Sequence, residues 1–202
     1  MARLALARRI DIAAQLAVRA RTYFDVFEFF EDVETGPRIN DAINDYPWFF
    51  RLHHHVYRFA FIVEIAGLFK RTTGTVNLPH LLKECRSSLK ETEWQAVSTK
   101  LDEWRPIAEK AELIRSKALA HRSADLDYDD AFKEANVTRN QLRGLSDLSL
   151  DVANRLCEAT GRSTQIFVTR ETVRDAKRLF KALGSTFDES EPKSALDELF
   201  GE

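Results

Sequence analysis

The sequence predicts an all-α fold, a bundle of long helices joined by short connecting ones. Glycine (7) and proline (5) are scarce among the 202 residues, so long stretches lack helix breakers. Apolar residues recur in these stretches at three- and four-residue intervals, the period of one face of an α-helix. At this length the chain can bury one sizeable core. We therefore expect a single all-α domain over residues 1–183 and an acidic tail over residues 184–202.

The first half of the chain is expected to form two long helices. The first spans about residues 3–30, where apolar positions fall on one stripe. A glycine and a proline in residues 34–38 then predict a turn. The second long helix begins at Pro47, a residue type favoured in the first helical turn, and ends near residue 71. Residues 59–68 are apolar nearly all round, so this helix should lie at the centre of the bundle.

The second half is expected to hold shorter helices and then another long one. Pro106 forces a kink or a restart after the helix that precedes it. Thr138 has the position and chemistry of an N-cap for the long helix that follows it. Gly161 fits the end of that helix. The expected helices span residues 78–85, 91–105, 106–122, 131–135, 138–159 and 170–183.

Composition and charge restrict the classes of function. A formal net charge of −2 gives no overall attraction to nucleic acid, so an RNA contact would need a local basic patch. Cys85 and Cys157 lie far apart within predicted helices, and buried thiols in a reducing compartment are expected rather than a disulfide or a metal site. No segment offers the roughly 20 apolar residues of a membrane span, and the N-terminus lacks a signal-peptide core. We expect a soluble, cytoplasmic protein.

Arg115 and His121 are candidates for RNA chemistry. RNA can be cut without a metal when its own 2′-hydroxyl attacks the neighbouring phosphate, which requires a cation at the phosphate and a group that moves protons. Arginine binds phosphate through a permanently charged fork, and histidine titrates near neutral pH. On an ideal helix six positions place the two side chains about 120° apart. They would converge only if the helix ends at His121 or a second copy completes the site; otherwise they are a surface arginine and a helix-terminal histidine.

Histidine and aspartate clusters suggest a metal site but fit one poorly. Consecutive helical residues point about 100° apart, so His53–His55 cannot chelate one ion, and His80 has no partner at ligand spacing. The four aspartates in residues 125–130 lack the glycine and the distal glutamate of a calcium loop. Partly buried or interface histidines, and helix capping by Asp127 or Asp129, are the simpler interpretations. We expect no metal and no cofactor.

Basic residues gather late in the chain. Residues 137–181 hold nine basic residues against five acidic ones. A solvated helix face and a track for a phosphate backbone both fit this pattern. Five of the nine fall on one side of the last predicted helix: Arg170, Arg174, Lys177, Arg178 and Lys181.

Four sequence blocks occur in order within residues 49–156: FIVEIAGLFKR, TVNLPHLLKE, EWRPIAEKAELIRSKALAHRS and LDYDDAFKEANVT. Their order and spacing resemble the HEPN superfamily (higher eukaryote and prokaryote nucleotide-binding domains), in its abortive-infection AbiU-like branch. The third block holds Arg115 and His121 at the spacing of the superfamily's arginine–histidine motif. The resemblance implies an all-α bundle that forms a two-fold homodimer, with the arginine and histidine of both protomers in a shared cleft.

Active members of that superfamily are metal-independent endoribonucleases, often toxins or phage-defence effectors. By this resemblance Arg115 would hold and polarise the scissile phosphate, and His121 would act in proton transfer. Ser116 stands where the pattern most often has asparagine or aspartate, and its hydroxyl has a shorter reach and offers fewer hydrogen bonds. Lys117 and Arg122 are further candidates for RNA contact.

Two hypotheses follow from the sequence. One is an RNA endonuclease of a defence or toxin module, with RNA, a second copy and an antitoxin or other defence-system protein as partners. The other is a catalytically inactive HEPN bundle that binds RNA, a nucleotide or a protein. The tail over residues 184–202, with six acidic residues and one lysine, is expected to be mobile or held by a neighbour. It could also fold back on the basic helix, or be an inert solubilising segment.

Overall fold

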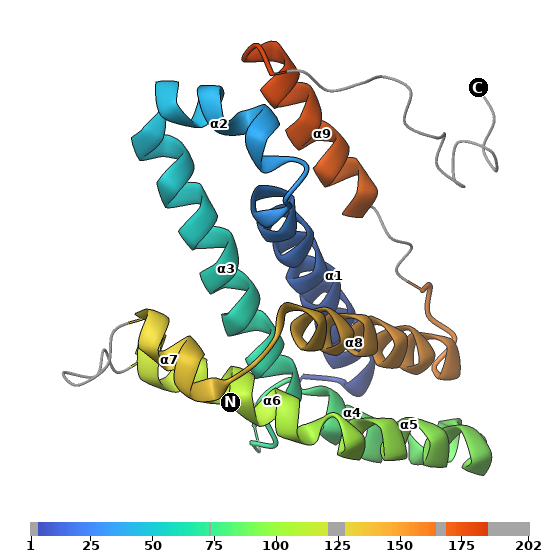
Figure 1. The fold of residues 1–202 in the computed structure, drawn as a ribbon. Coiled ribbons are helices and arrows are strands. Elements are labelled where there is room, and N and C mark those ends of the chain that lie inside the picture. Colours follow the sequence, from blue (N-terminus) through green and yellow to red (C-terminus); the bar gives the residue numbers. More distant parts are fainter. Residues whose placement is uncertain (1–3, 73, 121–127, 165–168, 186–202) are drawn as a thin grey trace, which may run out of the picture.

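The long first helix is the axis of the fold (Figure 1). A computed structural model describes residues 4–72, 74–120, 128–164 and 169–185. Every regular element in these ranges is a helix, which confirms the all-α prediction. In chain order the helices are α1 (Leu6–Glu31), α2 (Gly36–Asp45), α3 (Pro47–Phe69), α4 (Leu78–Glu84), the 3-10 helix η1 (Arg86–Ser88), α5 (Glu91–Glu103), α6 (Arg105–Ile114), the π-helix η2 (Arg115–Ala120), α7 (Tyr128–Ala135), α8 (Arg139–Ala159) and α9 (Thr169–Ala182).

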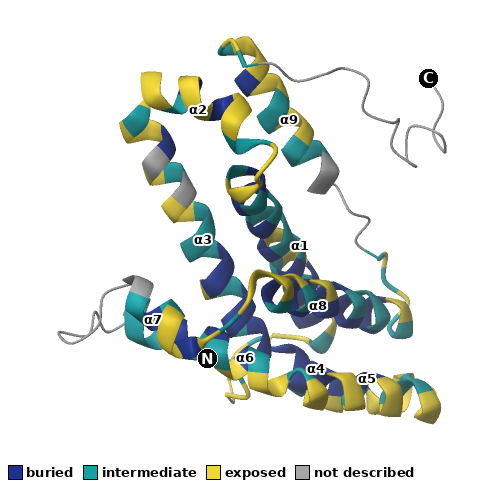
Figure 2. Cartoon of the chain, in the orientation of Figure 1, coloured by how far each residue is buried: buried dark blue, intermediate teal, exposed yellow. Residues whose placement is uncertain are grey.

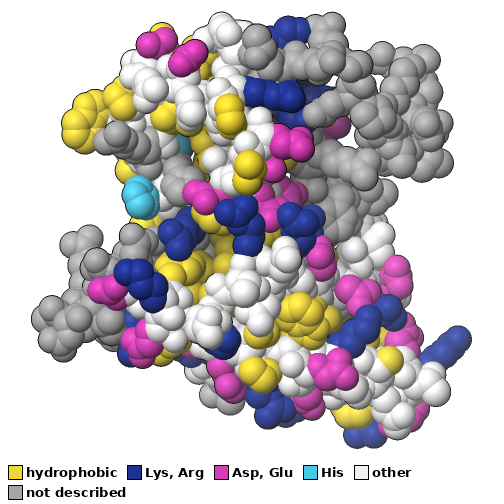
Figure 3. Space-filling view, viewed as in Figure 1, with side chains coloured by type: hydrophobic (Ala, Val, Ile, Leu, Met, Phe, Trp, Pro, Cys, Tyr) yellow, Lys and Arg dark blue, Asp and Glu magenta, His cyan; other side chains and the backbone are white. Residues whose placement is uncertain are grey.

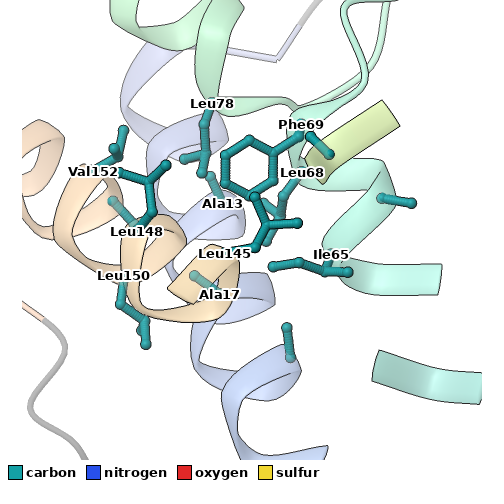
Figure 4. Packing of buried hydrophobic residues seen from close by; sticks show 14 of the residues in the cluster. Ala13, Ala17, Ile65, Leu68, Phe69, Leu78, Leu145, Leu148, Leu150 and Val152 are labelled. Carbon is teal, nitrogen blue, oxygen red and sulfur yellow. The ribbon is translucent and has the colours of Figure 1, made fainter. Parts of the chain in front are cut away.

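The main core forms where α3 and α8 pack on α1. Buried alanines along α1 leave room for the larger side chains of its neighbours. In Figure 4, Ala13 and Ala17 lie between the apolar side chains of α3 and those of α8. Ile65 of α3 and Leu145 of α8 are fully buried there. A small residue on one helix opposite large ones on the next is how interiors reach crystal-like packing density.

A second, smaller core lies at the other end of α1. Phe29 of α1, Phe50 of α3 and Phe180 of α9 bury their rings together, with Ile39 and Ala42 of α2. The rings of Phe50 and Phe180 stack with centroids 4.9 Å apart. This cluster fastens α2 and α9 to the bundle. In Figure 1, α9 and α2 lie side by side at the top of the view.

Local capping explains the start of the last long helix. The side chain of Thr138 accepts a hydrogen bond from the backbone N–H of Gln141 (3.2 Å), and the Gln141 side chain accepts one from the backbone N–H of Thr138 (3.0 Å). This reciprocal capping box satisfies two N–H groups that a helix terminus leaves unpaired. The prediction that Thr138 is the N-cap is confirmed. Gly161 follows the helix with a positive φ of 65°, as expected of its C-terminal glycine.

Two predicted boundaries are wrong. The segment after α1 was expected to be a turn around Gly36 and Pro37, but a helix starts at Gly36 and continues to Asp45. A proline in the first helical turn lacks only an N–H that has no helical partner in any case, so it does not break the helix. α7 also begins earlier than expected, at Tyr128 and not at Ala131. The acidic tail from residue 186 onward lies outside the described residues.

None of the helices in the described ranges is both long and apolar enough to cross a bilayer. Both cysteines are free and buried, as expected. Burial raises the pKa of the Cys85 and Cys157 thiols, which keeps them protonated and unreactive.

Candidate functional site

The candidate catalytic segment begins where α6 changes its helical winding. α6 is regular up to Ile114, and residues Arg115–Ala120 continue it as the π-helix η2. A π-helix forms i→i+5 hydrogen bonds, is rare, and occurs most often as a single turn at functional sites. Of the helix predicted over residues 106–122, the described part, which ends at Ala120, is present in two different windings. The 120° separation estimated for an ideal α-helix does not apply to this segment.

Packing fixes this junction against two neighbouring helices. Ala111 and Ile114 of α6 are fully buried, and Ala118 of η2 packs partly on the same core. η2 contacts both α3 and α7. On the α3 side, the guanidinium of Arg58 lies 3.7 Å from the centre of the Phe132 ring of α7. The segment that carries Arg115 is thus part of a packed structure, which is what a site with fixed geometry needs.

Arg115 is held by a carboxylate one turn before it. Its Nη1 donates a hydrogen bond to Oε2 of Glu112 at 2.8 Å. The other carboxylate oxygen of Glu112 accepts a 2.5 Å hydrogen bond from Nζ of Lys70, at the C-terminal end of α3. Glu112 therefore joins two cations and ties the arginine to α3. The Arg115 side chain remains 31% exposed, and its fork has five N–H donors in total.

The structure describes only some of the other candidate residues in this segment. Ser116 is half-buried in η2. Lys117 forms an ion pair with Glu134 of α7. His121 and Arg122 lie outside the described residues, so the structure does not test whether Arg115, Ser116 and His121 face one cleft.

The basic face of α9 lies away from this segment within one protomer. Figure 1 shows α9 next to α2 at one end of the molecule and α6 and α7 at the other end. Arg174 pairs with Glu171, and Arg178 lies 3.5 Å from Asp175. Lys181 is exposed, whereas the side chain of Arg170 is not described. The α9 cations are thus not gathered around Arg115 in one copy of the chain.

Lys177 lines a cleft of about 430 Å³ between α1, α8 and α9. Both acidic and basic side chains line it. Arg143 donates hydrogen bonds to both carboxylate oxygens of Glu28 (2.6 and 2.7 Å), which raises the pKa of its guanidinium. Arg139 lies 3.2 Å from Glu31 at the rim. Since these ion pairs already neutralise the arginines, the cleft is better described as a polar joint between helices than as an anion site.

The other clusters singled out in the sequence have local roles. Nδ1 of His53 lies 2.8 Å from the carbonyl oxygen of Phe49, and Nε2 of His80 lies 3.1 Å from Oε1 of Glu84. Asp130 accepts a 3.0 Å hydrogen bond from Lys133 in α7, while Asp127 falls outside the described residues. Within the described ranges, no three histidine, cysteine or acidic side chains come together in a way that could hold a metal ion.

Sequence reasoning missed Glu112 and Glu134, the two carboxylates that pair with the candidate cations. Glu112 precedes Arg115 by three positions, a spacing at which helical side chains meet, so a search for local pairs could have found it. The contact of Glu134 with Lys117 joins two helices and has no comparable sequence signal. Each carboxylate holds a candidate cation in place and lowers the local positive charge.

The geometry supports phosphate chemistry of a limited kind. A half-exposed arginine in a packed helical turn can bind a phosphate oxygen and offset the charge that develops on it. A proton-transfer group near neutral pKa must come from elsewhere in the segment, where His121 is the candidate.

Comparison with known proteins places this segment within a family match. Residues 4–183 match the family model of AbiU2, among the HEPN proteins. No curated protein and no solved structure shows significant similarity to the chain. The matched range includes every described helix, and so both the α6–η2 junction and α9. The resemblance drawn from the four sequence blocks is confirmed.

Proposed function

We propose, from the premise that this chain belongs to the AbiU2 family of HEPN proteins, that it is a metal-independent endoribonuclease of a toxin or phage-defence type. The observation that carries the proposal is Arg115. It stands at the first position of a π-helical turn, is half-exposed, and is tied by Glu112 to a packed junction. A fixed, partly exposed guanidinium in this family's motif position is the group that a transphosphorylation reaction requires.

In this reaction the 2′-oxygen of a ribose forms a bond to the adjacent phosphorus while the bond from phosphorus to the 5′-oxygen breaks. A base takes the proton of the 2′-hydroxyl, and an acid gives a proton to the departing 5′-oxygen. Arg115 offsets the charge on the phosphate oxygens, and His121 acts in proton transfer. The products are a 2′,3′-cyclic phosphate, which water can open to a 3′-phosphate, and a 5′-hydroxyl end.

One protomer supplies one arginine and one histidine, but the reaction needs both a proton acceptor and a proton donor. A two-fold homodimer would bring two such pairs to one cleft. Ser116 would hydrogen-bond within this cleft, and Lys117 and Arg122 would contact the RNA backbone beside it. The face of α9 would then hold RNA farther from the cleavage point.

A second candidate function is a catalytically inactive HEPN bundle that binds RNA, a nucleotide or a protein. The observation that favours it is Ser116, which stands where the motif most often has asparagine or aspartate. A half-buried serine reaches less far than either residue. The two candidates differ in whether Ser116→Asn increases a weak cleavage activity or changes nothing.

The experiment is cleavage of a labelled RNA by the full chain in the presence of EDTA, with analysis of the product ends. We expect cyclic or 3′-phosphate ends from the wild type and no cleavage from Arg115→Ala or His121→Ala. Arg105→Ala is a matched control, because Arg105 lies in the same helix and pairs with Asp102 three positions before it, as Arg115 pairs with Glu112. Cleavage that requires magnesium, or that survives both substitutions, would contradict the proposal and place the activity at another site.

Glu112→Gln distinguishes the effect of orienting the Arg115 guanidinium from the effect of RNA binding at the same site. Loss of the carboxylate removes a negative charge beside the phosphate-binding arginine, so RNA affinity should rise modestly. It also releases the guanidinium from its fixed direction, so the rate of the bound complex should fall. A rise in affinity with a fall in single-turnover rate identifies Glu112 as a positioning residue, and equal losses in both argue for a purely structural role.

A further inference from the structure

The outer face of α3 is apolar and uncovered. Five large side chains on this helix keep much of their surface in contact with water: Trp48 (87% exposed), Phe49 (52%), Leu52 (61%), Val56 (49%) and Val63 (44%). Figure 2 shows that exposure runs along the N-terminal half of α3, and Figure 3 shows hydrophobic side chains gathered where α2 meets α3. Soluble monomers rarely leave so many large apolar residues together on one helix.

These residues follow the spacing of a helix-pairing seam. Positions 49, 52, 56, 59 and 63 are separated by three, four, three and four residues, and all five are apolar. We call this set the α3 stripe; its fourth member, Phe59, is half-buried. A repeat of alternating three- and four-residue steps keeps apolar side chains on the line along which two helices meet. An apolar surface that does not pair with another helix would not require this spacing.

The stripe and Trp48, which lies four positions before Leu52 and so adjoins it, together offer enough area for a dimer. An aromatic side chain carries roughly 150–250 Å², so Trp48 and Phe49 at their exposed fractions leave on the order of 300 Å² in water. With the exposed parts of Leu52, Val56 and Val63, each copy offers on the order of 600 Å². Two copies would bury about 1,200 Å², which is the lower limit for specific interfaces.

Charge favours a protein partner over an anionic membrane. Residues 46–63 contain no acidic residue and two arginines, so a negatively charged bilayer is the main rival. Arg58, however, is turned toward the bundle, where its guanidinium lies over the rings of Phe132 and Phe27 at 3.7 and 5.9 Å. The ring of His53 lies against Phe49, with centroids 3.9 Å apart. All five members of the stripe itself are apolar.

We infer that the α3 stripe is the surface through which two copies of this chain pair, stripe against stripe, about a two-fold axis. A two-fold axis makes the same patch complementary to itself, which an apolar stripe without fixed charges permits. The inference rests on the proposed function in one respect, the need for a second copy to complete the Arg115 site. η2 contacts α3, so the helix that bears the stripe also contacts the segment that holds Arg115.

The first test compares Leu52→Glu with Val33→Glu by light scattering at micromolar concentration. Val33 is 85% exposed between α1 and α2 and is not part of the stripe, so it is a matched control. We expect a dimer for the wild type and for Val33→Glu, and a monomer for Leu52→Glu with unchanged helical content. A wild type that is monomeric, or a Leu52→Glu variant that remains dimeric, overturns the inference. Loss of binding to phosphatidylserine vesicles in Leu52→Glu, with a monomeric wild type, assigns the stripe to a membrane instead.

The second test finds the axis by disulfide cross-linking. Leu52→Cys, Val56→Cys and Val63→Cys are each oxidised mildly, with Val33→Cys as the control. The native thiols are buried and do not compete. We expect a cross-linked dimer from at least one stripe variant and none from the control. The inference fails if no stripe variant cross-links.

The position of the cross-link tests separately whether the copies pair through the stripe and whether their Arg115 sites share one cleft. A helix rises about 1.5 Å per residue, so moving the axis from Val63 to Leu52 moves the two copies of Arg115 apart by about 30 Å along α3. Cross-linking at Val63 agrees with both the interface and the shared cleft. Cross-linking at Leu52 alone keeps the interface and overturns the shared cleft. A chain that dimerises through the stripe and leaves RNA intact in EDTA overturns the proposed function only.

Discussion

The two halves of α3 differ in what covers them. In residues 59–69 six side chains are buried, among them Phe61, Ile62 and Ile65, because α1, α6 and α8 surround this half. In residues 47–58 Phe50 is buried against α2 and α9, while four large apolar neighbours are exposed. Apolar residues are frequent in both halves. Burial here is therefore decided by which helices arrive from elsewhere in the chain, and not by the local sequence of α3.

This difference has a functional consequence. The covered half holds the junction that fixes Arg115, through Lys70 at its end and through its contact with η2. The uncovered half has the apolar surface that a second copy could cover. A single helix would thus hold the site rigid at one end and join two sites at the other.

The largest expected effect comes from the same substitution made in each half. Phe61→Ala removes a ring that is 1% exposed and should lower the free energy of unfolding by about 3–5 kcal/mol, since it leaves a cavity. Phe49→Ala removes a ring that is 52% exposed and should cost less than about 1 kcal/mol in the monomer. Urea denaturation at low protein concentration measures both. Equal losses would mean that the two halves are equally covered.

A pair of glycines gives the next largest contrast. A Cβ at Gly144 of α8 would lie 2.1 Å from Cη2 of Trp104, whereas a Cβ at Gly67 of α3 would meet nothing within 4 Å. Gly144→Ala should destabilise the chain by about 1–3 kcal/mol through overpacking. Gly67→Ala should stabilise it by up to about 1 kcal/mol, since alanine favours the helix. Thermal unfolding of both variants checks the signs, and destabilisation by Gly67→Ala would show that something covers this face.

Local signals in the sequence predicted much of the fold. The three- and four-residue periodicity predicted most helices to within a few residues, because the apolar residues of an amphipathic helix lie on the side that faces the core. The Thr138 capping box was predictable for the same reason, since its hydrogen bonds span only three residues. Gly36 and Pro37 led to the wrong prediction of a turn, because the same two residue types can end a helix at one position and begin it at another.

The candidate site was predictable only as a motif. The change from α6 to a π-helix at Arg115 leaves the apolar pattern intact, so periodicity could not reveal it. The bond between Lys70 and Glu112 joins residues 42 positions apart and depends on how α3 meets α6. The exposure of the N-terminal half of α3 could not be predicted from the sequence either. Its phenylalanines were consistent with a central helix, and only the packing shows that one side of it is uncovered.

The smallest expected effect concerns the turn that leads into α2, the helix that covers part of the N-terminal half of α3. Oδ2 of Asp32 accepts hydrogen bonds from the backbone N–H (2.9 Å) and the hydroxyl (2.8 Å) of Thr35. These two bonds hold the pKa of the Asp32 carboxyl below its ordinary value. A lowered pKa in the folded chain means that folding favours the charged carboxylate. The stabilisation is therefore complete at neutral pH and is lost as the pH falls below about 4.

Asp32→Asn tests this contribution, because asparagine cannot carry the charge at any pH. At pH 7 the variant should be less stable than the wild type by less than about 1 kcal/mol, since Asp32 is exposed and Thr35 is only partly buried. As the pH is lowered through 4 the two unfolding curves should converge, because the wild type then loses its carboxylate. Asp41→Asn is the control, since it makes the same change at an exposed aspartate of α2 that lies outside this turn. A stability difference for Asp32→Asn that stays constant from pH 7 to pH 3 would show that the turn is held by shape and not by charge.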